Sequence, residues 1–180
     1  DNTDWRDAGD YTSNNVTQEE LFEWRDVTED SGTDSPQVFW SSAYCAISAA
    51  NHALRAIEEF GNPKSLDAQR VEALLVRAFN HFNLVNVFGK HYSEKTSETD
   101  LVVPYATEPE RTVNPHYERQ AVAEVYRLIE KDLLEGLPLI DDNEYTVPKY
   151  HFNRRAANAF AARFYLYCRK YDKVIEHVNT

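Results

Sequence analysis

Histidine is the residue type of this chain best suited to metal or proton chemistry, and the spacing of its histidines decides whether such chemistry is supported. Six are spread along the chain: His52, His81, His91, His116, His151 and His177. None belongs to an HExxH motif or to a pair four residues apart, which are helical spacings that hold zinc. No nucleophile elbow accompanies the serines and aspartates. The pattern therefore favours a protein that is not an enzyme and uses no metal or other cofactor.

The two cysteines, Cys45 and Cys168, would need suitable partners to act in redox or metal chemistry. Neither belongs to a CxxC motif, so the sequence supports no zinc site and no dithiol centre. Both fall in predicted helices, where free cysteine usually behaves as a small buried apolar side chain. We expect that role for both. A disulfide between them would require close approach and an oxidising compartment, and the sequence leaves this alternative open.

Residues 26–34 form an acidic stretch that invites comparison with a calcium-binding loop. Such a loop places Asp or Asn at alternate positions and Gly at the sixth. The stretch lacks this spacing, so we expect a solvated acidic loop.

Asn51 and Arg77 each interrupt an apolar stripe of a predicted helix. A buried amide without a partner costs about 1–3 kcal/mol, so Asn51 should hydrogen-bond the backbone of a neighbouring helix or loop. A buried guanidinium needs a carboxylate, so Arg77 should pair with Glu72 or with an acidic residue on a neighbouring helix. We expect both residues to be structural.

The charge balance narrows the class of partner. The chain has 19 Lys and Arg against 30 Asp and Glu, a net charge of −11. Such a surface repels phosphate backbones and anionic lipid headgroups, so we expect neither nucleic acid nor a membrane surface as a partner. No apolar run approaches the about 20 residues that a spanning helix needs. Because the chain lacks Met and begins in a polar stretch, we expect a processed product from which any targeting or lipid-anchor segment has been removed.

Apolar residues spaced three or four apart show that helices must position these side chains. Residues 1–36 form a polar, acidic segment with a short helix expected at 17–27. The first long helix is expected at 37–60, ended by Gly61, and carries two adjacent stripes. One contains Trp40, Tyr44, Ile47, Asn51, Leu54 and Glu58, and the other contains Ala43, Ala46, Ala50, Ala53, Ile57 and Phe60.

A second helix is expected to follow Ser65 as its N-cap and to end at Phe88, with Gly89 as its C-cap. Its inward stripe contains Val71, Leu75, Ala78, Phe82, Val85 and Phe88. The connection to the first helix is only a few residues long, so the two should form an antiparallel hairpin.

Residues 90–117 break the helical pattern and contain three prolines. A connection of this length is usually functional or mobile. Helices are expected again at 117–135, after the cap Asn153, and from Tyr171. Alanine-lined helix pairs that meet aromatic residues are typical of tetratricopeptide-like repeats. We therefore predict an all-α fold of stacked antiparallel helix pairs, with long irregular loops and a helical-repeat domain at 37–180.

Five motifs follow one another in this domain. They are Trp40…Tyr44…Ala50-Asn51, the run 72–85 followed by Phe88-Gly89, the segment Val103-Pro104-Tyr105, the helix 119–133, and the run 153–175. In this order they resemble the N-terminal, tetratricopeptide-like part of the SusD/RagB family of outer-membrane nutrient-binding lipoproteins. The segment after Gly89 lacks the family's early proline, and residues 1–36 match no family motif. Complete family members are much longer, so the resemblance covers their helical first half.

The resemblance implies a non-enzymatic surface protein that is lipid-anchored in the outer membrane. Such a protein captures an oligosaccharide or another nutrient and passes it to a TonB-dependent, SusC-like transporter. Glycan binding needs aromatic faces that stack on sugar C–H groups, flanked by polar side chains that reach the hydroxyls. The candidate ligand-binding residues are therefore the aromatic residues expected to be exposed in loops: Trp5, Trp24, Tyr92 and Tyr105.

A second interpretation needs no sugar. A stack of helix pairs has a concave face that can bind a peptide or a partner protein, which would make the chain a protein-interaction scaffold.

Overall fold

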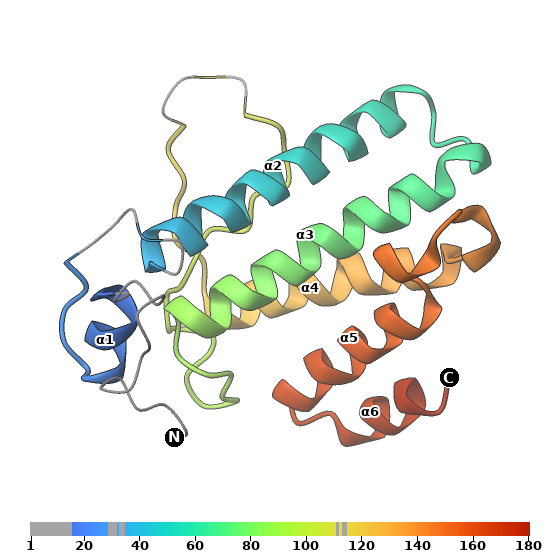
Figure 1. Cartoon of the computed structure of the whole chain (residues 1–180). Coiled ribbons are helices and arrows are strands. Elements are labelled where there is room, and N and C mark those ends of the chain that lie inside the picture. The colour runs from blue at the N-terminus through green and yellow to red at the C-terminus, as the bar shows by residue number, and fades with distance from the viewer. Residues whose placement is uncertain (1–15, 29–31, 33–34, 111, 113–114) are drawn as a thin grey trace, which may run out of the picture. The chain divides into compact units, whose positions relative to one another are not determined.

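The computed structural model describes residues 16–28, 32, 35–110, 112 and 115–180, and in these residues the chain is all-α (Figure 1). The chain divides after Ser42 into two compact units, residues 1–42 and 43–180. Helix α2 (Pro36–Glu59) begins in the first unit and continues into the second. The fold class predicted from the sequence is confirmed.

In the first unit, α1 (Val16–Phe22) is the short helix expected at 17–27, and it ends earlier than expected. Trp24 lies in the left-handed region, with φ 57°, which stops the helix. The Glu20 carboxylate accepts hydrogen bonds from the Thr28 backbone N–H at 2.9 Å and from the Thr28 hydroxyl at 2.5 Å. These bonds fold the segment after the helix back onto Glu20.

In the second unit, α2 leads through η1 (Lys64–Leu66) into α3 (Asp67–Phe88), and the two long helices run antiparallel as predicted (Figure 1). Gly61 (φ 81°) and Asn62 (φ 52°) take the left-handed conformation that ends α2. Ser65 is not the N-cap of α3, and that prediction is wrong. It lies inside η1, whose last residue, Leu66, takes the N-cap position of α3 without a side-chain hydrogen bond.

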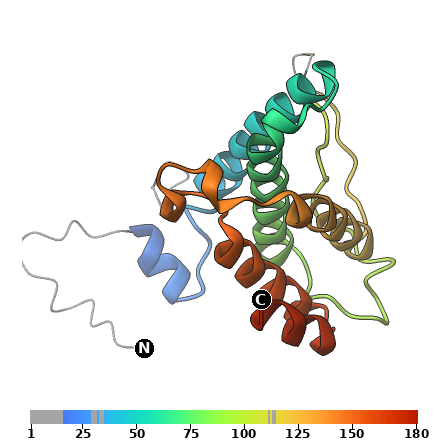
Figure 2. The ribbon, with the colours of Figure 1, turned by 90° about the vertical axis from the view of Figure 1, so that its right-hand side faces the viewer.

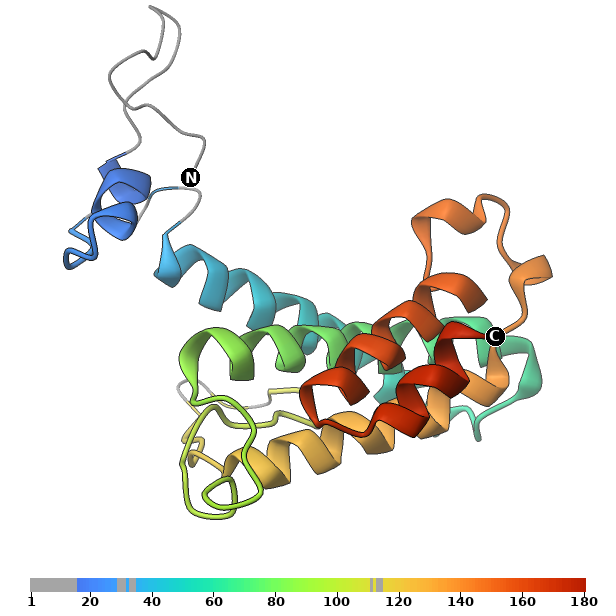
Figure 3. The same cartoon turned by 90° about the horizontal axis from the view of Figure 1, so that it is seen from below.

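Three more α-helices and three short 3₁₀ turns complete the second unit: α4 (Val122–Gly136), η2 (Leu137–Leu139), η3 (Asp142–Glu144), η4 (Pro148–Tyr150), α5 (Arg154–Tyr167) and α6 (Tyr171–Val178). The Asn153 side chain accepts a hydrogen bond from the Ala156 N–H at 2.9 Å, so the predicted cap of α5 is confirmed. Figures 1 and 3 show α4 running along α3 and α6 lying beside α5, and these are the pairs in closest contact.

Helix α4 begins five residues after the position expected from the sequence, at Val122 rather than Tyr117. The preceding residues are extended because they pair with Leu101 and Val102, in the middle of the long connection. Leu101 and Ala121 form an isolated antiparallel bridge, and the Val102 N–H donates to the Gln120 carbonyl at 2.8 Å. Figure 2 shows the connection lying alongside α2 and α3.

The core of the second unit is built on α3. Five of the six residues of the inward stripe predicted for this helix are at most 1% exposed: Val71, Leu75, Ala78, Phe82 and Val85. The Phe82 ring has four aromatic neighbours, with centroid distances between 5.0 and 6.3 Å. These neighbours come from α4 and α5, so one side chain of α3 joins three helices.

The cysteines differ from expectation in one respect. Both are free, and Cys168 is buried as predicted, whereas Cys45 is exposed. Cys45 lies on α2 opposite the face that carries the buried residues Ala43, Ile47 and Ala50. The apolar character of cysteine does not by itself decide which side of a helix is covered.

Gly89 ends α3 with an extended backbone (φ −125°, ψ 173°), so it is not chosen for a left-handed turn. Glycine is required here because neighbouring atoms approach the Cα too closely to leave room for a side chain. A Cβ at this position would lie 2.3 Å from Val102 Cγ2 and 2.6 Å from the Val85 carbonyl oxygen. Val102 of the long connection therefore packs directly against the end of α3.

We expect Gly89→Ala to lower the free energy of unfolding by about 1–3 kcal/mol, because the added methyl group overpacks a site bounded by backbone. Urea unfolding of the chain followed by circular dichroism measures the change. Gly136→Ala is the matched control, since its Cβ would meet neighbours at 3.6–3.7 Å, an ordinary contact distance. Equal effects of the two substitutions would contradict the argument from close approach.

Candidate functional site

Arg77 of α3 and Asp132 of α4 form a buried ion pair at the centre of the second unit. Nε and Nη2 of Arg77 donate to Oδ2 and Oδ1 of Asp132, each at 2.7 Å. Asp132 is 2% exposed and Arg77 is 9% exposed. Burial works against the charged guanidinium, but the bonds to Asp132 outweigh it and leave the pKa of Arg77 raised. The predicted pairing with a carboxylate on a neighbouring helix is confirmed, and Glu72 is not the partner.

Asn51 of α2 extends the pair into a network. Its Oδ1 accepts from Arg77 Nη1 at 3.0 Å, and its Nδ2 donates to the carbonyl oxygens of Ala106 at 3.0 Å and Glu108 at 3.4 Å. The prediction that this amide binds a neighbouring backbone is confirmed. Asn51 thereby attaches the long connection to α2.

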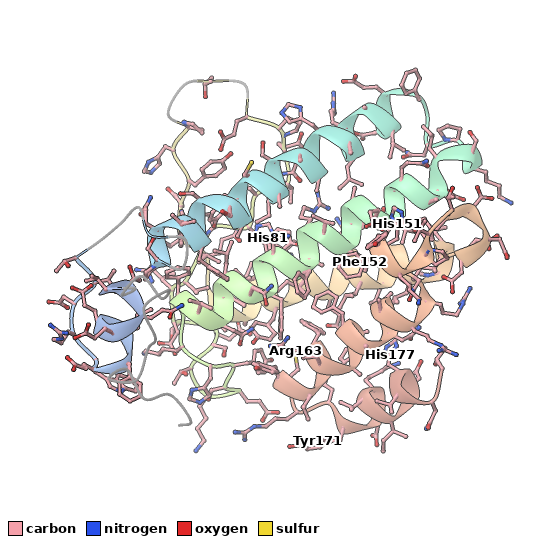
Figure 4. All side chains as sticks on the ribbon, in the orientation of Figure 1. His81, His151, Phe152, Arg163, Tyr171 and His177 are labelled. Atoms are coloured by element: carbon pink, nitrogen blue, oxygen red, sulfur yellow. The ribbon has the colours of Figure 1, made fainter. Side chains whose placement is uncertain are left out.

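Tyr105 and His81 complete the network, and Figure 4 shows His81 on α3. The Tyr105 hydroxyl donates to Asp132 Oδ2 at 2.6 Å, and its ring stacks on His81 with centroids 3.7 Å apart. His81 Nε2 accepts from the Ala106 N–H at 3.1 Å, so its proton is on Nδ1, which donates to the Arg77 carbonyl at 2.9 Å. Burial lowers the pKa of His81 to about 3. His81 is therefore a neutral acceptor that holds the connection.

Hydrogen bonds from residues outside the buried network also hold residues 102–105 of the connection. The Tyr44 hydroxyl donates to the Pro104 carbonyl at 2.8 Å. Arg119 Nε donates to the Val102 carbonyl at 2.8 Å, and the Tyr105 N–H donates to Gln120 Oε1 at 3.1 Å. The apolar run that the sequence placed in a loop is thus an anchored part of the core, with Val102 and Val103 buried.

The four aromatic residues predicted as ligand contacts have different environments. Trp5 lies outside the described residues. Trp24 is 93% exposed, in the first unit. Tyr92 is half-buried, its ring centroid 4.9 Å from that of Tyr126. Tyr105 is 6% exposed, so the expectation that it is exposed in a loop is wrong: its ring and hydroxyl are both occupied by the buried network.

Tyr92 lines a cavity of about 320 Å³ together with Glu94, Lys95, Cys168 and Arg169. A second cavity, of about 360 Å³, opens beside Asn51 and Arg77 and is lined mainly by charged side chains. Its arginines are paired with carboxylates, Arg55 with Glu58 and Glu59, and Arg70 with Glu135. In the cavity beside Asn51 and Arg77, these arginine charges are therefore balanced by neighbouring carboxylates. The cavity beside Tyr92 instead combines an aromatic ring with polar groups.

Sequence reasoning passed over Tyr150, which is 84% exposed on η4. The polar region between α4 and α5 has no helical periodicity, so nothing in it distinguishes a covered ring from an uncovered one. The signal that could have drawn attention to it is the pair Tyr145 and Tyr150 around Pro148.

Among the described residues, no group of three His, Cys, Asp or Glu side chains could hold a metal ion. In the same part of the chain, no helix combines the length and the apolar character needed to cross a bilayer.

Comparison with known proteins shows which family this chain is similar to. The SusD-like family model described as "Starch-binding associating with outer membrane" matches residues 2–166. A SusD superfamily protein from Bacteroides thetaiotaomicron VPI-5482 is 25% identical, with a TM-score of 0.72 over 84% of this chain and 33% of its own. A SusD superfamily protein from Bacteroides fragilis is 25% identical, with a TM-score of 0.73 over 92% of this chain and 38% of its own.

A laminarin-binding SusD-like protein is also similar, at 25% identity and a TM-score of 0.61, over 79% of this chain and 29% of its own. No curated protein matches. The chain spans between 29% and 38% of the length of these three solved structures.

We expect Asp132→Asn to lower the free energy of unfolding by about 3–5 kcal/mol, because it leaves the Arg77 charge buried without a counter-charge. Urea unfolding of the chain checks this. Glu124→Gln, on the same helix, removes the exposed partner of Arg127 and should change stability little. A loss for Asp132→Asn no larger than that of the control would show that the buried pair does not hold the helices together.

The depressed pKa of His81 predicts a pH dependence with a definite sign. Above about pH 6.5 His81 is neutral in both states. As the pH falls from there toward 3 only the unfolded chain takes up the proton, so stability falls by at most about 1.4 kcal/mol per pH unit from this group. The difference in unfolding free energy between the wild type and His81→Gln should therefore shrink between pH 7 and pH 5. His52→Gln, at an exposed position, is the control, and a constant difference for His81→Gln would contradict the prediction.

Proposed function

Because this chain belongs to the SusD-like family, described as starch-binding and associating with the outer membrane, we propose that it is the helical scaffold of a surface glycan-binding protein. The match over residues 2–166 is the observation that carries the proposal. The similarity to a laminarin-binding SusD-like protein supports an oligosaccharide as the ligand. The chain spans about a third of its solved relatives, so the proposal concerns the whole protein.

In this proposal the helices are the rigid part and the loops contact the ligand. The buried network from Asn51 to Tyr105 holds the long connection against α2, α3 and α4, which leaves Tyr105 as a positioning residue. Trp24 offers an uncovered indole, and Tyr92 offers a half-buried ring beside Lys95. An aromatic face beside polar groups suits a ligand with both C–H and hydroxyl surfaces. Trp5 stays a candidate from the sequence.

The protein would act without catalysis, as a capture component at the cell surface. It would be held at the outer membrane by a lipid anchor and would pass its ligand to a TonB-dependent, SusC-like transporter. The helix faces that do not pack within the second unit would provide the surface for the transporter.

A protein-interaction scaffold without a sugar role is the second candidate. The observation that favours it is the apolar surface of the last two helices, where several side chains are 51–68% exposed: Leu166, Tyr171, Ile175 and Val178. Such a surface can serve a transporter as well as another protein, so only ligand binding separates the two candidates.

We expect the whole protein to bind maltohexaose or laminarihexaose in isothermal titration calorimetry. Trp24→Ala should weaken binding by about fivefold, the equivalent of one aromatic stacking contact of about 1 kcal/mol. Phe60→Ala is the matched control, because Phe60 is a 77% exposed aromatic residue at the end of α2. No binding across a broad glycan panel would overturn the glycan proposal, and recovery of a partner other than a transporter in a pull-down would then favour the scaffold.

A further inference from the structure

A third cavity, of about 400 Å³, lies between the start of α3 and the segment that joins α4 to α5. Gln69 and Glu72 line it from α3, and Glu144, Tyr145, Tyr150 and His151 line it from the segment. Figure 4 shows His151 on the segment that leads into α5. The volume falls within the range of about 300–1,000 Å³ that is typical of small-molecule sites.

The aromatic wall of this cavity is held in place by the protein. Tyr145 and His151 are stacked, with centroids 4.5 Å apart and planes at 10°. Glu72 supports them: its Oε2 accepts from the Phe152 N–H at 3.1 Å, and its Oε1 lies 3.7 Å from His151 Nδ1. The Tyr145 hydroxyl donates to the Ala68 carbonyl at 3.5 Å. A wall fixed in this way is preorganised, which lowers the entropic cost of binding.

The neighbouring residues anchor the same segment. Phe152 packs edge-on against Phe79 of α3, with centroids 6.0 Å apart. Asn153 Nδ2 donates to the Pro148 carbonyl at 3.0 Å, and the Arg154 N–H donates to Asp142 Oδ1 at 2.8 Å. The turn that carries Tyr150 is therefore tied to α3 and to the first turn of α5.

Tyr150 itself is left uncovered by this framework. It is 84% exposed, and its ring makes no aromatic contact within the described part of the chain. A large aromatic side chain on an anchored turn, at the edge of a cavity, presents an apolar face to solvent without contributing to the core. Such a face is suited to stacking on a flat ligand.

The polar groups of the cavity indicate what kind of ligand would stack there. The Gln69 amide and the Glu144 carboxylate have no side-chain partner among the described residues, so both remain available to a ligand. Together they supply donors and acceptors for hydroxyl groups. None of the described residues that line the cavity is Lys or Arg, and the nearby carboxylates repel an anion. The cavity therefore suits a neutral hydroxylated ring rather than a uronate, sulfate or phosphate.

We propose that this cavity is a subsite for a neutral pyranose unit, with the sugar face on Tyr150 and its hydroxyls bonded to Gln69 and Glu144. The inference rests on the proposed glycan-binding function. It places sugar binding in a cavity that none of the four candidate residues predicted from the sequence lines.

The test is calorimetric titration of the whole protein with maltohexaose, laminarihexaose and an oligogalacturonate of the same length. Tyr150→Ala should weaken binding of a neutral hexasaccharide by about fivefold or more, the loss of one stacking contact. Tyr150→Phe should retain most of the affinity because it keeps the ring. Gln69→Ala should also weaken binding, and Phe60→Ala should leave it unchanged.

The outcomes separate the two proposals. Binding by the wild type that Tyr150→Ala and Gln69→Ala leave intact overturns the subsite and leaves the glycan-binding function standing. The subsite also fails if Phe60→Ala weakens binding as much as Tyr150→Ala, or if the oligogalacturonate binds more tightly than both neutral probes. Absence of binding to every glycan overturns the proposed function itself. Thermal unfolding of each variant confirms that it folds, which is expected for substitutions at exposed positions.

Discussion

Arg77 brings a positive charge into the interior of the second unit, where Asp132 neutralises it through two bonds of 2.7 Å. A buried charge of this kind is costly unless every donor and acceptor around it is used. The surrounding residues meet that requirement: Asn51 accepts from the guanidinium and Tyr105 donates to the carboxylate. Three helices and the long connection therefore depend on one another through polar contacts as well as through apolar packing.

This network explains how a long connection with three prolines can be part of the core. The backbone of residues 104–108 lacks a strand partner, so its carbonyl and N–H groups need side chains to satisfy them. Tyr44, Asn51 and His81 supply those bonds. His81 can do so only while neutral, because its Nε2 must accept a hydrogen bond. Burial keeps it neutral by holding its pKa at about 3.

The use of hydrogen-bonding groups and ring faces also distinguishes the scaffold from the candidate binding surface. Aromatic residues that serve the core have both their faces and their hydroxyls engaged, as Tyr105 does. Trp24 and Tyr150, which are 93% and 84% exposed, lie outside the α-helices, Tyr150 in the short turn η4. In the proposed function the helices supply rigidity, and short anchored turns supply the sugar-binding faces. The Tyr145–His151 wall shows that a turn can be as well supported as a helix when a carboxylate such as Glu72 holds it.

The amino-acid sequence determined the helices, because spacing, caps and turn residues are local properties. The stripe from Val71 to Val85, the cap at Asn153 and the left-handed turn at Gly61 could all be predicted from it. It also predicted that Asn51 and Arg77 need polar partners, since an unsatisfied buried group is costly wherever it lies. The order of the motifs was sufficient to indicate the family.

Only the tertiary structure decided which partners those residues find and which aromatic residues remain exposed. Asp132 is 55 residues from Arg77 along the chain, and local spacing carries no information about a contact at that separation. Tyr105 directly follows Pro104 and Tyr150 lies two residues after Pro148, both outside the α-helices, yet one is 6% and the other 84% exposed. Exposure depends on what packs against a side chain from elsewhere in the chain. The sequence could therefore indicate that aromatic residues are the candidates for sugar binding. Which residues come together in one cavity could be seen only in the folded structure.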